Sequence, residues 1–303
     1  MSRIHDALKR AEQERATSTG THIEPAYEQP QLQNDAQRDT MPSLQSSGAT
    51  VMPAMSSGGM NYESLLARCP QARWSPDERT MLFFQDDDSR LGAEEFRTLR
   101  SRLYQIREKM ALKRLMVTSA LPKEGKSFVA ANLAQVLVRQ HGRRVLVIDA
   151  DLRNPGMHRH LGTAQTPGLS EYLLGECDEF AAMQRGPMEN LFFMPGGRVA
   201  GSAPELLSNG RFKLFLQRVE PLFDWIVIDT SPVIPVSDAT LVAGSCDGIL
   251  MVVRSNVTPS DLALRARQEF PDQLLLGVVL NGAPAESIQH SKYYYGEAVT
   301  SPA

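Results

Sequence analysis

Long apolar runs are missing from this sequence of 303 residues. The longest one, residues 274–280, has the length of a β-strand, whereas a helix that crosses a bilayer needs about 20 apolar residues. The first 16 residues alternate charged and apolar side chains and lack the apolar core of a secretory signal peptide. We therefore expect a cytoplasmic protein without a direct membrane span.

Cysteine is scarce, and neither sign of charge dominates. Cys69, Cys177 and Cys246 are too few and too scattered for a disulfide framework or a zinc site, so we expect buried thiols in a reducing compartment. The chain has 32 basic and 35 acidic residues, a net charge of −3. This balance gives no reason to expect a nucleic-acid partner.

Large apolar side chains are also rare between the first residues and residue 62. This segment is rich in Ser, Thr, Gln, Gly and Pro and cannot bury enough surface to offset its ordering entropy, so we expect a disordered linker over residues 17–62. Before it, residues 1–16 place Ile4, Leu8 and Ala11 on one face of a short amphipathic helix. That helix is either a docking element for a partner or a solvated tail.

The rest of the chain alternates apolar runs with helical patterns. Strands are expected at residues 115–119, 145–150, 191–194, 225–229, 248–253 and 276–280, and helices at residues 93–110, 127–140 and 204–219. Runs of Val, Ile and Leu separated by helices are typical of a parallel sheet covered on both faces. The sequence therefore predicts one α/β domain over residues 63–290, a parallel sheet flanked by helices, with a C-terminal tail over residues 291–303.

A phosphate-binding motif joins the first predicted strand to its helix. Residues 119–127 read Ser-Ala-Leu-Pro-Lys-Glu-Gly-Lys-Ser and fit the P-loop pattern, with Ala120 in place of the first glycine. Loop amides and a helix N-terminus bind phosphate, Lys126 neutralises the β- and γ-phosphates, and the Ser127 hydroxyl can bind Mg²⁺. The predicted nucleotide contacts in this motif are Pro122, Lys123, Glu124, Gly125, Lys126, Ser127 and Phe128.

Lys123 stands where such loops often carry glycine. A left-handed backbone at this residue would cost about 1 kcal/mol. Its side chain would alternatively add a second positive charge close to the phosphates. The sequence leaves both interpretations open.

Carboxylates follow two of the predicted strands. Asp149 and Asp151 end one strand and Asp229 ends another, which places them at the edge of the sheet where ligands bind in α/β folds. Asp229 has the position of a Walker-B carboxylate that holds the Mg²⁺ shell. Asp149 and Asp151 can face the same ion or an attacking hydroxyl or water, and their individual roles stay open. The predicted catalytic residues are Lys126, Asp149, Asp151 and Asp229, and the predicted metal ligands are Ser127, Asp149 and Asp229.

At these motifs the chain resembles the bacterial tyrosine kinases, and more narrowly the cytoplasmic CpsD/CapB-type kinases of polysaccharide biosynthesis. The resemblance covers about residues 93–296 and includes further motifs at residues 153–158, 168–175, 204–207, 236–239, 253–258 and 277–281. It implies a P-loop NTPase architecture like that of MinD and ParA, ATP and Mg²⁺ as cofactors, and Arg153 and Asn281 as further nucleotide contacts. Two positions depart from the family pattern: Lys123 replaces a glycine, and Ser231 replaces a proline.

Two further features favour a kinase within this resemblance. Tyr293, Tyr294 and Tyr295 stand together near the C-terminus, and such a cluster is the family's autophosphorylation substrate. Glu94, Arg97 and Arg100 recur at a spacing of three, a pattern that mediates ring-like self-association in the family. The alternatives are a packing role for the tyrosines and a solvated charged helix face for the second motif.

The resemblance thus implies an ATP-dependent protein tyrosine kinase that autophosphorylates in trans and regulates capsule or exopolysaccharide synthesis or export. It also implies recruitment to the inner face of the cell membrane by a separate activator or co-polymerase. A MinD- or ParA-like positioning ATPase is one alternative, although Leu121 stands where those proteins carry a signature lysine. The other is a nucleotide-dependent scaffold of a polysaccharide export complex.

Overall fold

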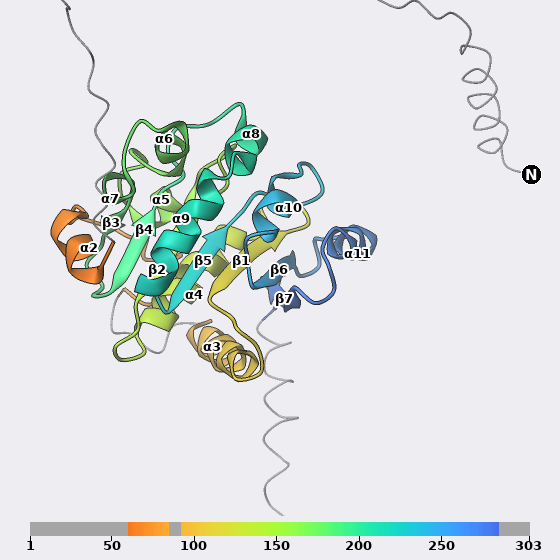
Figure 1. Cartoon of the computed structure of the whole chain (residues 1–303). Coiled ribbons are helices and arrows are strands. Elements are labelled where there is room, and N and C mark those ends of the chain that lie inside the picture. The colour runs from red at the N-terminus through yellow and green to blue at the C-terminus, as the bar shows by residue number, and fades with distance from the viewer. Residues whose placement is uncertain (1–59, 85–91, 285–303) are drawn as a thin grey trace, which may run out of the picture. The chain divides into compact units, whose positions relative to one another are not determined.

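The computed structural model describes residues 60–84 and 92–284, which fall within one compact unit, residues 57–303. Their seven-stranded sheet has the order β3-β4-β2-β5-β1-β6-β7 (Figure 1). All neighbouring strands are parallel except β3, which is antiparallel to β4. The strands are β1 (Arg114–Ser119), β2 (Val145–Asp149), β3 (Gln184–Arg185), β4 (Leu191–Met194), β5 (Trp225–Asp229), β6 (Gly248–Arg254) and β7 (Leu275–Asn281). The predicted α/β class is confirmed.

Helices cover both faces of this sheet (Figure 1). One face packs against α2 (Tyr62–Arg68), α6 (Leu169–Leu174), α7 (Glu179–Ala182), α8 (Ala203–Ser208), α9 (Arg211–Val219), η1 (Glu220–Leu222), α10 (Asp238–Ala243) and α11 (Ser260–Gln268). The other face packs against α3 (Ala93–Arg107), α4 (Lys126–Val138) and α5 (Met157–Leu161).

The central strands β2 and β5 are apolar up to the aspartate that ends each of them, because both of their faces are buried. In β5, Ile226 and Ile228 join the core on one face, while Trp225 and Val227 join the core on the other. The strand period of two thus divides a continuous apolar run between two cores. Because these strands are parallel, the polar residues at their carboxyl ends lie at the same edge of the sheet.

Helix α4 is the most deeply placed helix, with every residue from Val129 to Val138 buried. The segment before α3 covers its outer side. There the side-chain oxygens of Asn132 and Gln135 accept the backbone N–H groups of Leu82 (2.8 Å) and Phe83 (3.2 Å). This packing holds the helix that follows the phosphate loop in a fixed position.

One predicted helix is wrong in its extent. The single helix expected over residues 204–219 is two helices, α8 and α9, separated at Asn209 and Gly210. Gly210 has a φ of +81°, a left-handed conformation that ends one helix and precedes the next. The local apolar pattern continues through this break, which is why periodicity alone joined the two.

Among the helices of residues 60–84 and 92–284, none combines the length and apolar character of a membrane span. All three cysteines are free thiols; Cys69 and Cys246 are buried and Cys177 is half-buried. The expected N-terminal helix, nearly all of the expected linker and the C-terminal tail lie outside the described residues.

Candidate active site

The phosphate loop lies between β1, which ends at Ser119, and α4, which begins at Lys126, as the sequence predicts. Gly125 precedes α4 with a φ of +96°. A Cβ atom at this residue would lie 2.1 Å from the amide nitrogen of Asn281, so both the backbone and the close approach require glycine.

One of the two interpretations of Lys123 is confirmed, and the other, a second positive charge close to the phosphates, stays a prediction. Its φ is +65°, so the strained left-handed conformation is present, and its side chain is exposed to solvent. The guanidinium of Arg254 donates a hydrogen bond of 3.1 Å to the Lys123 carbonyl. This contact helps to offset the cost of the backbone conformation.

Lys126 points into a group of carboxylates. Its Nζ lies 2.8 Å from Oδ2 of Asp151, and the side chains are 13% and 6% exposed. Burial alone would lower the pKa of Lys126, but the charges of Asp229, Asp151 and Asp149 outweigh burial and raise it above its ordinary value. The lysine is therefore a permanent cation, ready to exchange a carboxylate partner for phosphate oxygens.

The carboxylate of Asp149 is held by backbone donors. Its Oδ2 accepts the N–H groups of Gly156 (2.9 Å) and Met157 (3.0 Å) at the start of α5, and its Oδ1 accepts that of Asp151 (3.2 Å). Burial raises the pKa of Asp149 to about 6, although the Met157 N–H and Lys126 act against it. Three backbone donors therefore fix the orientation of the Asp149 carboxylate, and its predicted roles in catalysis and metal binding stay predictions.

Asp229 is placed beside Asp149, since the two residues are paired in the register of β2 and β5. Both of its carboxylate oxygens are fully buried, and neither makes a hydrogen bond of good geometry among the described residues, although the nearby Ser127 hydroxyl still lowers the pKa of Asp229. Burial raises the pKa of Asp229 to about 7, and Lys126 lowers it only in part. An orphaned buried carboxylate of this kind is costly unless a cation occupies the space beside it.

These residues fit a magnesium ion. Mg²⁺ takes oxygen ligands and usually binds one or two carboxylates together with water and nucleotide phosphates. Asp229 and the nearby Ser127 hydroxyl supply such a partial set.

Arg153 has a charged partner within the protein. Its guanidinium forms a bidentate ion pair with Asp238, at 2.6 and 3.1 Å, and that carboxylate is 1% exposed. Asp238 is the first residue of α10, so the pair ties the loop after β2 to this helix. Arg153 thus has a positioning contact within the protein, and the nucleotide contact that the resemblance implies for it stays a prediction.

Two other predicted nucleotide contacts are also engaged by the protein. The ring of Phe128 packs edge-on against Phe96, with centroids 5.9 Å apart. The Asn281 amide donates a hydrogen bond of 2.9 Å to the Glu124 carbonyl. The adenine contact that the resemblance implies for Asn281 stays a prediction.

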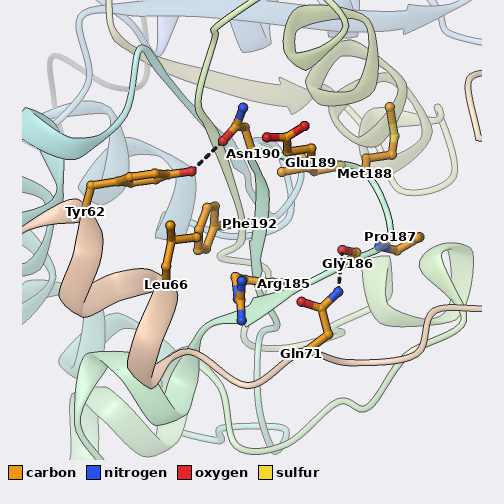
Figure 2. Close-up of a pocket in the computed structure, with 11 residues that line it drawn as sticks. Tyr62, Leu66, Gln71, Arg185, Gly186, Pro187, Met188, Glu189, Asn190 and Phe192 are labelled. Carbon is orange, nitrogen blue, oxygen red and sulfur yellow. Dashed lines mark hydrogen bonds between the residues drawn. The ribbon is translucent and has the colours of Figure 1, made fainter.

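A pocket of about 400 Å³ lies away from this site, between α2 and the connection that leads into β4 (Figure 2). Tyr62 donates a hydrogen bond of 2.5 Å to Asn190 there, and Gln71 donates one of 3.2 Å to the Gly186 carbonyl. Asn190 precedes the amino end of β4, whereas the P-loop follows the carboxyl end of β1. None of the predicted site residues lines this pocket.

Comparison with known proteins decides the family. Residues 115–291 match the family described as the CobQ/CobB/MinD/ParA nucleotide binding domain. Tyrosine-protein kinase YwqD of Bacillus subtilis (strain 168) is 34% identical over 227 residues, which are 74% of this chain and 94% of YwqD. The chain belongs to the bacterial tyrosine kinases.

Other tyrosine kinases and one transport protein align with the same part of the chain. The succinoglycan biosynthesis transport protein ExoP of Rhizobium meliloti (strain 1021) is 31% identical over 244 residues, which are 74% of this chain and 31% of ExoP. The kinase domain of the Escherichia coli tyrosine kinase ETK superposes with a TM-score of 0.60 at 29% identity, covering 72% of this chain and 82% of that domain.

In this tyrosine kinase the charged motif lies on α3, as expected. Glu94 and Arg97 form an ion pair of 3.2 Å on an exposed part of the helix. Arg100 donates a hydrogen bond of 3.2 Å to the Val136 carbonyl near the end of α4. Arg100 therefore also attaches α3 to the core. The tyrosine cluster, Tyr293 to Tyr295, lies outside the described residues.

Three residues that the sequence analysis gave no role contribute to the site of this kinase. They are Thr258 and Arg254, which contact the P-loop, and Asp238, which holds Arg153. All three lie in motifs that carried the family resemblance. Their position in these motifs was the only sign in the sequence that they have a role. Their partners lie more than 80 residues away in the sequence and are identified only by the structure.

Proposed function

We propose that this bacterial tyrosine kinase transfers the γ-phosphate of ATP to Tyr293, Tyr294 and Tyr295 of a second copy of the chain. The observation that carries the proposal is the buried group formed by Lys126 and the aspartates at the ends of β2 and β5. A single cation among three carboxylates at a P-loop is suited to exchange one carboxylate partner for phosphate. Kinase relatives that align over most of this chain support the same reaction class.

The residues at the P-loop and at the strand ends have separate roles in this reaction. The loop amides and Lys126 bind the β- and γ-phosphates, and Ser127 with Asp229 would hold Mg²⁺, with Asp149 contributing through water. Bound Mg²⁺ supplies charge neutralisation for the phosphates. The tyrosine oxygen attacks the γ-phosphorus, the bond to the β-phosphate oxygen breaks, and ADP leaves.

Asp151 is the better acceptor for the tyrosine proton. Its Oδ2 is paired with Lys126 here and becomes available once the lysine turns to the phosphates. The oxygens of Asp149, in contrast, are held by three backbone N–H groups. Such catalysis depends on positioning and charge more than on covalent chemistry.

The direct test is incubation of the full chain with ATP and Mg²⁺, followed by peptide mapping of phosphotyrosine. Phosphate is expected on the C-terminal cluster, and the variant with Tyr293, Tyr294 and Tyr295 all changed to Phe should lose it. ATP hydrolysis without phosphotyrosine would instead favour the positioning ATPase. Nucleotide binding without turnover would favour the scaffold.

The proposal extends to polysaccharide export and to partners. ExoP, a succinoglycan biosynthesis transport protein, aligns with most of this chain, which supports a role in capsule or exopolysaccharide synthesis or export. We place the kinase in the cytoplasm, recruited to the inner face of the membrane by a separate activator or co-polymerase. The N-terminal segment, residues 1–16, is the candidate docking element.

Self-association through α3 would bring the tyrosines of one copy to the P-loop of the next. Light scattering of the Arg97→Ala/Arg100→Ala variant is expected to show smaller particles than the wild type, because both cations leave the helix face. Arg102→Ala, which removes another exposed arginine of α3 outside the motif, is the matched control. An unchanged mass for the double variant would refute this role of α3.

A further inference from the structure

Glu124 is a buried acid inside a loop that binds phosphate. It is 2% exposed, and its Oε2 accepts the backbone N–H of Leu121 at 2.7 Å. Its Oε1 accepts the hydroxyl of Thr258 in a short hydrogen bond. The carboxylate is thereby directed toward the connection between β6 and α11.

The same side of the loop has two more attachments. The Asn281 amide, at the end of β7, donates to the Glu124 carbonyl at 2.9 Å, and Arg254, at the end of β6, donates to the Lys123 carbonyl at 3.1 Å. The Arg254 backbone N–H also donates to the Thr258 hydroxyl at 3.1 Å. Hydrogen bonds from the ends of β6 and β7, and from the connection between β6 and α11, therefore hold one side of the P-loop in place.

We propose that Glu124 and Thr258 form a clamp that sets the P-loop in its phosphate-binding conformation, with both as positioning residues. This rests on the nucleotide-dependent function proposed above. The clamp has two effects. It fixes a loop that contains two left-handed residues, Lys123 and Gly125, and it keeps a negative charge turned away from the phosphates.

The electrostatic effect predicts a specific dependence between the two residues. Without the Thr258 hydroxyl, the Glu124 carboxylate loses one of its two hydrogen bonds and is free to turn toward the other loop amides, where it would compete with phosphate. A neutral amide at this position would compete far less. Loss of the hydroxyl should therefore matter when residue 124 is an acid and matter little when it is an amide.

Calorimetric titration of the full chain with ATP in the presence of Mg²⁺ tests the clamp. Thr258→Val is expected to weaken ATP binding about tenfold, as for the loss of a hydrogen bond to a charged group, and to raise KM for ATP more than it lowers kcat. Thr258→Ser keeps the hydroxyl and should bind like the wild type. Thr240→Val, whose lost hydroxyl donates only to Ser237 in its own turn, is the matched control.

A double variant gives the sharper result. In the Glu124→Gln background, Thr258→Val should change ATP affinity by less than about twofold, because coupled residues are not additive. Equal ATP affinity of Thr258→Val and a wild type that binds ATP would overturn the clamp alone. A fully additive double variant would also overturn it. Failure of the wild type to bind ATP would overturn the clamp and the proposed function together.

Discussion

Replacing Lys126 with methionine is expected to lower the rate of tyrosine phosphorylation by about 10²–10³-fold or more, the scale on which one preorganised charge or donor acts in a transition state. Lys126 is the cation that the structure places among the site's carboxylates, and its pKa is raised by them. Methionine keeps the length and apolar stem of the side chain and removes the charge. Phosphotyrosine formation with saturating ATP and Mg²⁺ measures the loss.

The same substitution should also destabilise the nucleotide-free protein. Asp151 loses its partner at 2.8 Å, and Asp149 and Asp229 lose a neighbouring positive charge. Breaking a buried ion pair from one side costs about 3–5 kcal/mol. Lys213→Met, which removes an exposed lysine on α9, is the matched control and should leave both activity and stability near the wild type. A Lys126→Met variant with wild-type kinase rate would refute the role of the P-loop lysine.

Asp229→Asn is expected to have opposite effects on stability and activity. The buried carboxylate makes no hydrogen bond of good geometry among the described residues, so neutralising it should stabilise the nucleotide-free protein at pH 8. We expect the free energy of unfolding to rise by about 2 kcal/mol, which corresponds to about 5 °C in Tm. This gain is smaller than the full cost of an unpaired buried charge, because Lys126 lies close to Asp229. Phosphorylation should fall about 10²-fold or more, because the variant loses its carboxylate contact to Mg²⁺.

The direction of the pKa shift sets the pH dependence of this gain. A carboxyl whose pKa is raised on folding contributes stability that is fully present below its ordinary value of 3.8 and is lost as the pH rises through about 7. At pH 4 the wild-type carboxyl is protonated in the folded state and resembles Asn. The difference in Tm should therefore be small at pH 4, grow between pH 4 and 7, and level off above pH 8.

Thermal unfolding across that pH range, without nucleotide or metal, checks the prediction. Asp272→Asn is the matched control, since its side chain is 84% exposed, and it should show no such rise. A loss of stability in Asp229→Asn at pH 8 would mean that the carboxylate is better satisfied than the structure shows. An unchanged kinase rate would remove Asp229 from the proposed metal site.

Much of this architecture could be predicted from local sequence. Strands such as β2 and β5 are continuous apolar runs that end in aspartate, and that pattern gives both a buried parallel strand and a polar side chain at its end. The P-loop carries its own backbone signature in Gly125, Lys126 and Ser127. These features depend on neighbours in sequence, so periodicity and motif spacing are sufficient to find them.

Contacts between residues that lie far apart in the sequence could not be predicted in this way. Arg153 pairs with Asp238, 85 positions away, and Glu124 with Thr258, 134 positions away. Which of several charged or hydroxyl side chains meets an arginine or a buried acid depends on how strands β1, β2, β5 and β6 are ordered in the sheet. Sequence spacing carries no such information, so the Asp238 partner of Arg153 was not foreseen and Thr258 was given no role.

The most direct test of the central claim mixes two inactive variants. Lys126→Met keeps the tyrosine cluster but lacks the P-loop cation, and the Tyr293→Phe/Tyr294→Phe/Tyr295→Phe variant keeps the cation but lacks the cluster. After incubation of the mixture with ATP and Mg²⁺, mass spectrometry should find phosphate on the tyrosines of the Lys126→Met chain, while each variant alone shows none. A mixture without phosphotyrosine, beside a wild type that forms it, would contradict transfer between copies.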